Sequence, residues 1–317
     1  MYRLTARIEI TGSKNWVINN VTEVEITLDS EQLTDICKIT LPKKIKWDGE
    51  NNIPLKRGDG VKVYLGYDDS LQLAFIGYIR DIGVKTPVVI TCEDEMFCLK
   101  QIPTEKKAYK SVDIETLLKD QGIRYKLNVM GEQRLGQYRV TADTIAALLG
   151  HLNENGIRSF FRYEDGNPVL YCGVLFDKEE GASQVFDTNL NIISDQLEQQ
   201  EAENIRLRIK AISLLPNNKK IKIMVGDADG EHRTIHAYNK TEEELKAWAE
   251  QEISRLKQTG LKGHFTTFGY KLVDKLTAIG LKIDGDKKGI YQVKKNIIKY
   301  GTGGFRQEIT IGSKISV

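Results

Sequence analysis

Apolar and polar residues alternate with a period of two through both ends of this chain, and this feature constrains its fold most. Residues 4–10 and 61–65 alternate in this way in the N-terminal part, and residues 205–211 and 221–225 do so in the C-terminal part. This period is typical of strands with one buried face. Short strands separated by turn residues are typical of small barrels or sandwiches. The sequence therefore predicts a mainly β protein.

The middle of the chain, residues 101–185, has a different pattern. One helix is predicted after Ser111 as its N-cap and ends at Gly122, and another begins after Thr141 and ends at Gly156. Leucine and isoleucine recur at helical spacing in both helices. Strand patterns lie between and after them, so this segment is predicted to form an α+β domain.

The last part of the chain returns to strands and contains one amphipathic helix over 241–259. Thr241 and Glu244 have the spacing of a capping box, and Gly260 stands at the expected C-cap. The predicted domains are a first β-barrel over 1–100, the α+β domain over 101–185 and a second β-barrel over 186–317.

A pattern at 55–82 recurs at 271–298. Each copy begins with Leu-Lys or Lys-Leu, continues as an alternating strand, meets an Asp/Gly turn and resumes with a glycine followed closely by a tyrosine. Identity between the copies is weak, so the pattern predicts a structural repeat. We expect two similar small β-barrels flanking the α+β domain.

The first copy contains Arg57-Gly58-Asp59, a tripeptide known from cell-adhesion ligands. A strand pattern begins directly after Gly60, and Gly58 and Gly60 are suited to the positive φ of a tight turn. A match of three residues carries little information. The tripeptide is therefore predicted to be a turn, and a receptor ligand is the alternative.

Candidate metal sites are few. His232 and His236 are four residues apart on a predicted strand, which separates them by about 13 Å, and no suitably spaced Cys or Glu accompanies them. Asp227-x-Asp229-Gly230 resembles the start of a calcium loop but lacks the remaining ligands. We interpret it as a hairpin turn. No metal and no cofactor are predicted.

Candidate catalytic sites are also few. The adjacent carboxylates Glu93, Asp94 and Glu95 are of the kind that glycoside hydrolases use, but nothing in their context marks them. Gly301–Gly304 precedes neither Lys-Ser/Thr nor a helix, so it is predicted to be a hairpin between two C-terminal strands and not a phosphate loop. No catalytic residue is predicted.

Composition limits the partners and the compartment. The chain has 46 Lys and Arg against 44 Asp and Glu, a net charge of +2, which gives no argument for nucleic acid as the main partner. No secretory h-region and no stretch of 18 apolar residues occur, so neither export nor a membrane span is predicted. The four cysteines form no CxxC pair and are expected to be small buried side chains in a reducing cytoplasm.

The C-terminal third carries a family resemblance. After the helix EEELKAWAEQEISRL, glycines and strand residues stand in a recurring order: Gly269, Gly280, Gly289, Tyr291, Val293 and Gly303-Gly304. This part resembles the late control protein D family, the baseplate hub proteins of contractile-tailed bacteriophages, and the first halves of type VI secretion spike proteins. The N-terminal segments RGDGVKVYLGY and FIGYIRDIG are similar to the first barrel of that family. The resemblance spans residues 1–317.

Two departures from the family pattern stand out. Many relatives have a histidine near the end of the Tyr-x-Val strand, where this chain has Ile298, Lys299 and Tyr300. No OB-fold or β-helical needle follows before Val317. The resemblance therefore favours a separate hub that receives its spike as another polypeptide.

The resemblance implies a structural function without catalysis. A homotrimer with two barrels in each subunit gives a pseudo-sixfold ring that joins a hexameric tail tube to a trimeric tail spike protein. A tape-measure protein is a further candidate partner, whereas a membrane and a specific nucleic-acid sequence are not expected. The protein would assemble in the bacterial cytoplasm and then reside in the baseplate of a phage or prophage tail, as a virion component. Candidates for a polar axial lining are Arg206, Arg208, Lys210, Lys294 and Lys295.

Two other classes of function remain open. A tail-associated cell-wall hydrolase would place its site in 101–185, where His151, Glu154 and Asp165 lie. A module that binds carbohydrate or a host receptor is suggested by the 13 Tyr and 3 Trp. Most of these aromatic residues lie within alternating strands, which favours a place in the core.

Overall fold

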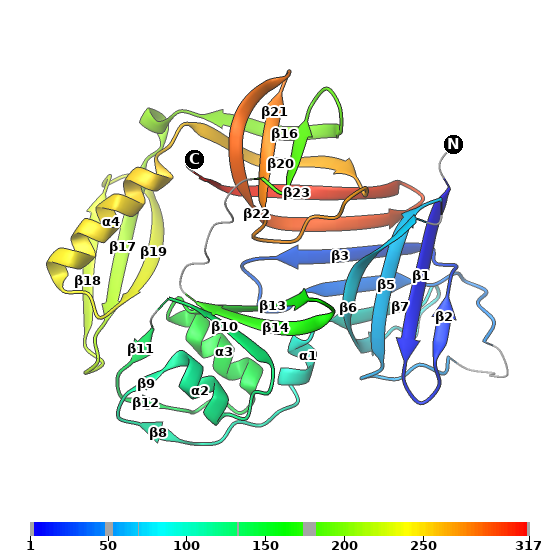
Figure 1. The fold of residues 1–317 in the computed structure, drawn as a ribbon, viewed down its shortest axis with the longest axis horizontal. Coiled ribbons are helices and arrows are strands. Elements are labelled where there is room, and N and C mark those ends of the chain that lie inside the picture. Colours follow the sequence, from blue (N-terminus) through cyan, green and yellow to red (C-terminus); the bar gives the residue numbers. More distant parts are fainter. Residues whose placement is uncertain (1–2, 48–52, 69, 132, 174–181, 316–317) are drawn as a thin grey trace. The chain divides into compact units, whose positions relative to one another are not determined.

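The computed structural model describes residues 3–47, 53–68, 70–131, 133–173 and 182–315 (Figure 1). Strands dominate the fold, as the sequence predicts. The chain forms two compact units. The first unit comprises 1–97, 179–197 and 263–317, and the second comprises 98–178 and 198–262.

The first unit contains two sets of strands, although the end of β16 and the start of β20 belong to the second unit. The N-terminal strand set consists of β1 Leu4–Thr11, β2 Trp16–Ile18, β3 Glu23–Asp29, β4 Ile36–Thr40, β5 Gly60–Tyr67, β6 Ser70–Ile82 and β7 Val89–Glu93. The C-terminal strand set consists of β15 Gln184–Asp187, β16 Ile192–Gln200, β20 Gly260–Phe268, β21 Ala278–Ile283, β22 Asp286–Gly301 and β23 Gly304–Ile315. A short helix, α1 Met96–Leu99, follows β7 at the end of the first unit's N-terminal segment.

The two strand sets are joined in one sheet of 13 strands by the pairing of β3 with β22, which lie side by side in Figure 1. β22 is 16 residues long. Its first residues pair with β21, and residues 295–300 pair with β3. Two separate barrels are therefore not confirmed by the described strands, because this long strand continues the ladder from one set into the other.

The division of the chain also differs from three consecutive domains. The predicted third domain, 186–317, is divided between the two units, because residues 198–262 belong with the α+β segment. The predicted boundary at residue 100 lies close to the end of the first segment of the first unit, at Phe97. Sequence patterns identify strands, whereas the partners of those strands decide which of them share a core.

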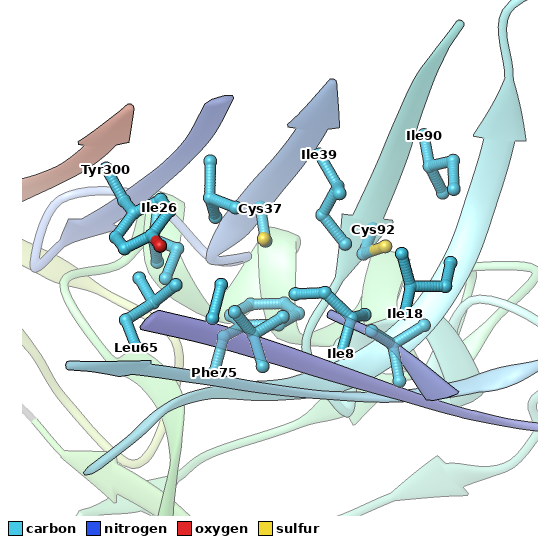
Figure 2. Packing of buried hydrophobic residues seen from close by; sticks show 14 of the residues in the cluster. Ile8, Ile18, Ile26, Cys37, Ile39, Leu65, Phe75, Ile90, Cys92 and Tyr300 are labelled. Atoms are coloured by element: carbon cyan, nitrogen blue, oxygen red, sulfur yellow. The ribbon is translucent and has the colours of Figure 1, made fainter. Parts of the chain in front are cut away.

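A single hydrophobic cluster lies at the centre of the N-terminal strand set. Alternate residues of its strands point into it, among them Ile8, Ile39 and Leu65, which are fully buried (Figure 2). Tyr300 and Phe305 from the C-terminal strand set belong to the same cluster. The shared core explains why the two sets form one unit.

The Arg57-Gly58-Asp59 segment is a turn before β5, as predicted. Gly58 has a φ of 91°, and its N–H donates to the Ile79 carbonyl at 2.8 Å. The Asp59 carboxylate accepts a hydrogen bond from the Lys56 N–H at 2.8 Å. The expectation of a positive φ at Gly60 is wrong, because Gly60 is already the first residue of the strand.

The second unit contains the α+β segment and a small three-stranded sheet. In the α+β segment the elements are β8 Ala108–Tyr109, β9 Val112–Asp113, α2 Ile114–Asp120, β10 Lys126–Met130, β11 Arg134–Leu135, β12 Tyr138–Arg139, α3 Ile145–Glu154, β13 Arg158–Glu164 and β14 Asn167–Gly173. They are followed by the 3₁₀ helix η1 Ala202–Asn204, β17 Leu207–Leu214, β18 Lys220–Gly226, β19 Glu231–Tyr238 and α4 Glu242–Leu256.

Both helices of the α+β segment begin later than predicted. The N-cap of α2 is Asp113, whose carboxylate accepts from the Thr116 N–H at 2.8 Å. Ser111 instead donates to a strand carbonyl. The N-cap of α3 is Thr144 and not Thr141. In each case the residue directly before the first buried helical position provides the cap.

The three-stranded sheet has β17 at its centre, with β18 antiparallel and β19 parallel to it. The capping box of Thr241 and Glu244 is confirmed at the start of α4, whose Leu245 and Ala249 pack on the sheet. The predicted end of this helix is wrong, because its C-cap is Lys257 and Gly260 is the first residue of β20. The loop Asp227–Gly230 is not a hairpin turn, because β18 and β19 lie on opposite sides of β17. In the described part of the chain, no helix is long and apolar enough to cross a membrane.

Candidate functional site: the junction of the two strand sets

The strand ladder between β3 and β22 forms the centre of this junction. Val24 to Asp29 pair antiparallel with Lys295 to Tyr300. Asp29 also lies 3.6 Å from the Lys295 ammonium, and Lys294 forms an ion pair of 3.1 Å with Glu31. Exposed ion pairs of this kind contribute only about 0–1 kcal/mol. The backbone ladder and the core beneath it therefore hold the junction together.

The β5–β6 hairpin contacts the C-terminal strand set through polar side chains. The Tyr67 hydroxyl donates to the Phe305 carbonyl at 2.8 Å. The Gln72 amide donates to the Gly269 carbonyl at 2.7 Å and accepts from the Leu272 N–H at 3.0 Å. The two Gln72 bonds satisfy backbone groups of the segment between β20 and β21.

Phe305 packs between aromatic rings of both strand sets. Its ring centroid lies 5.6 Å from that of Tyr67 and 5.8 Å from that of Tyr300, and its side chain is fully buried. Tilted and edge-on aromatic pairs at such distances are favourable beyond the area they bury. Phe305 is thus an apolar anchor of the junction.

A buried group of charges links three loops at the junction. Lys275 is fully buried, and its ammonium lies 2.7 Å from an Asp35 carboxylate oxygen. The Asp35 N–H donates to the Asp94 carboxylate at 3.2 Å, and the Asp94 N–H donates to the Asp35 carbonyl at 3.2 Å. Asp94 accepts a further bond from the Met96 N–H at 3.1 Å. We call Asp35, Asp94 and Lys275 the buried charge cluster.

The pKa values of this cluster determine its charge. Burial lowers the pKa of Lys275, but the charges of Asp35 and Asp94 outweigh this effect and raise it above its usual value, so Lys275 is cationic. Burial, together with the negative charge of Asp35, raises the pKa of Asp94 to about 7. Burial also raises the pKa of Asp35, while Lys275 opposes that shift. The Lys275 ammonium lies against the Asp35 carboxylate, and Asp94, with its pKa of about 7, is the group of the cluster that titrates near neutral pH.

We expect Asp94→Asn to remove a pH dependence from the stability of the first unit. The folded pKa of Asp94 lies above its usual value of 3.8. Asp94 therefore disfavours folding progressively as the pH rises from about 4 to 7, by at most about 4 kcal/mol. Relative to the wild type, the free energy of unfolding of the variant should rise across this window and stay constant above it.

Urea unfolding followed by Trp16 and Trp47 fluorescence in a Trp248→Phe background measures this difference for the first unit. The lost acceptor oxygen of Asp94→Asn lowers stability by an amount that does not depend on pH. Only the slope against pH therefore tests the assignment. A constant difference between pH 4 and 7 would contradict it.

The sequence singled out Glu93, Asp94 and Glu95, and all three are buried. Glu93 accepts from Arg80 at 3.0 Å and Glu95 accepts from the Tyr78 hydroxyl at 3.2 Å, so each has its own partner. Sequence reasoning missed Lys275 and Asp35. No sequence pattern around Lys275 predicts that its side chain is buried. A lysine is normally expected at the surface.

The other sequence-predicted residues are dispersed. His232 and His236 lie on β19 as expected, while His151 and Glu154 lie on α3 and Asp165 forms the β13–β14 turn. Among the residues that the structure describes, no group of three or more His, Cys, Asp or Glu is arranged to hold a metal ion.

The Asp227 loop and the cysteines have ordinary structural surroundings. The Asp227 carboxylate accepts hydrogen bonds from the Lys257 ammonium at 2.5 Å and from the Leu207 N–H at 3.0 Å. These contacts give the carboxylate a structural role in its loop. Cys37, Cys92 and Cys172 are buried, as the sequence predicts, whereas Cys98 is only partly buried. Burial raises the pKa of Cys92 to about 12, so its thiol stays protonated and unreactive.

The chain was compared with known proteins by sequence and by structure. No family model matches the sequence, and no curated protein matches it. The structure is similar to a tail protein from Neisseria meningitidis MC58, with a TM-score of 0.65, 15% identity and coverage of 98% of this chain and 96% of that chain. A 43 kDa tail protein of prophage MuSo2 from Shewanella oneidensis gives a TM-score of 0.64, 16% identity and coverage of 98% and 97%.

A component of the Escherichia coli type VI secretion system is also similar, with a TM-score of 0.57, 12% identity and coverage of 98% of this chain and 77% of that chain. That protein is itself described as structurally similar to the T4 bacteriophage tail proteins gp27 and gp5. At these levels of identity the comparisons establish the fold. The resemblance inferred from the sequence is thus confirmed at that level: this chain has the fold of bacteriophage tail proteins and of a type VI secretion component.

Proposed function

We propose that the protein is a structural baseplate hub of a contractile phage or prophage tail. The observation that carries this proposal is the junction itself. Two strand sets of the same sheet order lie in one unit and share a ladder and a core. A chain with two such sets supplies two consecutive positions of a ring. The shared fold with phage tail proteins supports the same conclusion.

In this proposal each strand set is one small barrel-like tube domain, and three copies form a pseudo-sixfold ring. Cyclic closure is the usual way in which identical chains build a ring. One face of the ring receives the hexameric tail tube and the other receives the trimeric spike, with the tape-measure protein as a further partner. The hub acts by matching symmetries and has no catalytic role. It assembles in the cytoplasm and resides in the virion baseplate.

The basic residues suggested for the axial lining divide between the two units. Arg206 lies close to Asp227 and Asp229, at 3.7 and 3.8 Å, in the second unit. Lys294 and Lys295 lie on β22 within the junction and are balanced by acidic partners. We propose that Lys294 and Lys295 face the axis. A lining of paired charges is polar without a strong net charge.

Light scattering over a concentration series tests this proposal. We expect a trimer of about 107.7 kDa, three times the chain mass of 35.9 kDa, at high concentration or when the neighbouring spike protein is added. A chain that stays monomeric in both experiments would contradict the hub. Digestion of purified cell walls by the same preparation would instead favour the hydrolase alternative.

A further inference from the structure

The two strand sets have the same topology. In the N-terminal set the sheet order is β1-β5-β6-β7-β4-β3, and in the C-terminal set it is β15-β21-β22-β23-β20-β16. Apart from β2, which pairs with β1 at the end of the sheet, each strand of the N-terminal set has a counterpart at the same place in chain order and in sheet order. β1, β3, β4, β5, β6 and β7 correspond in turn to β15, β16, β20, β21, β22 and β23. The outermost pairs differ in direction, since β1 is antiparallel to β5 and β15 is parallel to β21. The sets nevertheless match strand by strand.

Two independent marks fix which residues of β6 and β22 correspond. The first residue of β5, Gly60, pairs with Tyr78, and the first residue of β21, Ala278, pairs with Gln292. Tyr78 thus corresponds to Gln292, an offset of 214 residues.

A β-bulge gives the same offset. Arg80 is the extra residue in the pairing of β6 with β7, which shifts between Ile79 and Asp81. Lys294 is the extra residue in the pairing of β22 with β23, which shifts between Val293 and Lys295. Arg80 and Lys294 are again 214 residues apart, and bulges are specific local features, so the two observations support the same alignment. By this alignment Asp81 in β6 corresponds to Lys295 in β22.

The counterpart strands differ in one respect. In β22, the residues from Lys295 onward pair with β3. In β6, the residues from Asp81 onward pair with β7, and no other described strand lies on their opposite side. Val84, two residues after the end of β6, is 98% exposed. Among the described strands, none takes beside the end of β6 the place that β3 takes beside β22.

The counterpart of β3 is β16, which also has an open edge. β3 pairs with β4 on one side and β22 on the other, whereas β16 pairs with β20 alone among the described strands. Its residues Ile193 to Gln196 are exposed, with Ile193 at 44%. Leu190, just before the strand, is 80% exposed. Such an edge with exposed apolar residues readily pairs with another chain.

We propose that β16 of one copy pairs antiparallel with residues Asp81–Val84 of the next copy, which form the end of β6 and the two residues after it. This contact reproduces between chains the β3–β22 ladder that joins the two sets within a chain. It is a head-to-tail contact, which gives a closed ring when the rotation closes and an open filament when it does not. Closure at three copies rests on the proposed function. The pairing itself rests on the matched strand sets.

Single-cysteine variants test this pairing. Val84→Cys and Gln196→Cys are made as separate chains in a Cys98→Ser background, because the other cysteines are buried. The two chains are mixed at the concentration where the trimer forms and treated with a short bismaleimide. We expect a covalent dimer of about 71.8 kDa, twice 35.9 kDa, in the mixture but not in either variant alone. This product places Val84 of one copy beside Gln196 of another, and together with a trimeric mass it identifies a head-to-tail contact.

Val17→Cys provides the matched control. Val17 is 55% exposed on β2, the strand at the other end of the sheet. Mixed with Gln196→Cys, it should give no dimer. A trimeric mass without the Val84–Gln196 product would overturn this pairing and leave the hub intact. A monomeric mass at every concentration, with no cross-link, would overturn both. Cross-linking of each variant with itself would show a twofold contact and also overturn the pairing.

Discussion

Replacing Lys275 with methionine is expected to lower the free energy of unfolding of the first unit by about 3–5 kcal/mol. The side chain is fully buried, and its ammonium lies 2.7 Å from Asp35. Methionine fills a similar volume but leaves the carboxylates of Asp35 and Asp94 buried without a cation. The measurement is urea unfolding at pH 8, again followed by Trp16 and Trp47 fluorescence without Trp248.

Lys271→Met is the matched control, since Lys271 is exposed and lies only four residues away. Its effect should stay within about 0.5 kcal/mol. The loss in Lys275→Met should also shrink at pH 5, because protonation of Asp94 removes part of the uncompensated charge. Equal stability of Lys275→Met and Lys271→Met at pH 8 would contradict the structural importance of the buried charge cluster.

Phe305→Ala is expected to destabilise the first unit by about 3–5 kcal/mol, the usual range for a buried phenylalanine. Phe305 is fully buried and lies in the shared core of both strand sets. Its removal leaves a cavity between the rings of Tyr67 and Tyr300. The loss in stability relative to the wild type should be the same at pH 5 and pH 8, in contrast to Lys275→Met.

Phe268→Ala makes the same substitution at a residue that is 43% exposed. Phe268 packs against the Arg306 guanidinium, 4.8 Å from the ring centroid. That contact is worth about 0.5–1 kcal/mol at an exposed site, so the variant should lose no more than this. If both phenylalanine variants lost the same small amount, the two strand sets would not share a core.

Local features of the fold follow from the sequence where one physical signal dominates. The alternation around Val63 predicts β5, and the capping box at Thr241 predicts the start of α4. The caps of α2 and α3 are displaced from Ser111 to Asp113 and from Thr141 to Thr144. Several capping residues stand close together before each helix, and only the packing of the first buried turn selects among them.

Long-range features do not follow from the sequence. The partner of β3 is β22, more than 260 residues further along the chain, and any alternating strand has the pattern required to pair there. The parallel pairing of β17 with β19 likewise depends on the strand order of the sheet, which the sequence does not specify. Because of this order, the loop at Asp227 crosses over β17 to join β18 and β19, and is not the predicted hairpin turn. The repeat at 55–82 and 271–298 was visible, but its consequence for the sheet was not.

The buried charge cluster illustrates the same limit at the level of side chains. Asp94 was noticed because Glu93 and Glu95 flank it, whereas its interaction with Lys275 depends on two segments that meet only in the folded unit. A lysine in the sequence predicts an exposed side chain. Its burial is explained only by the carboxylates that surround it.

Electron microscopy of the purified trimer, with the spike added if assembly requires it, tests the central claim most directly. The claim is that the two strand sets of each chain occupy consecutive positions of one ring. Averaged views along the ring axis should show six similar tube domains around a central opening, although only three chains are present. Three lobes without that sixfold-like repetition, or a particle with twofold symmetry, would contradict the account.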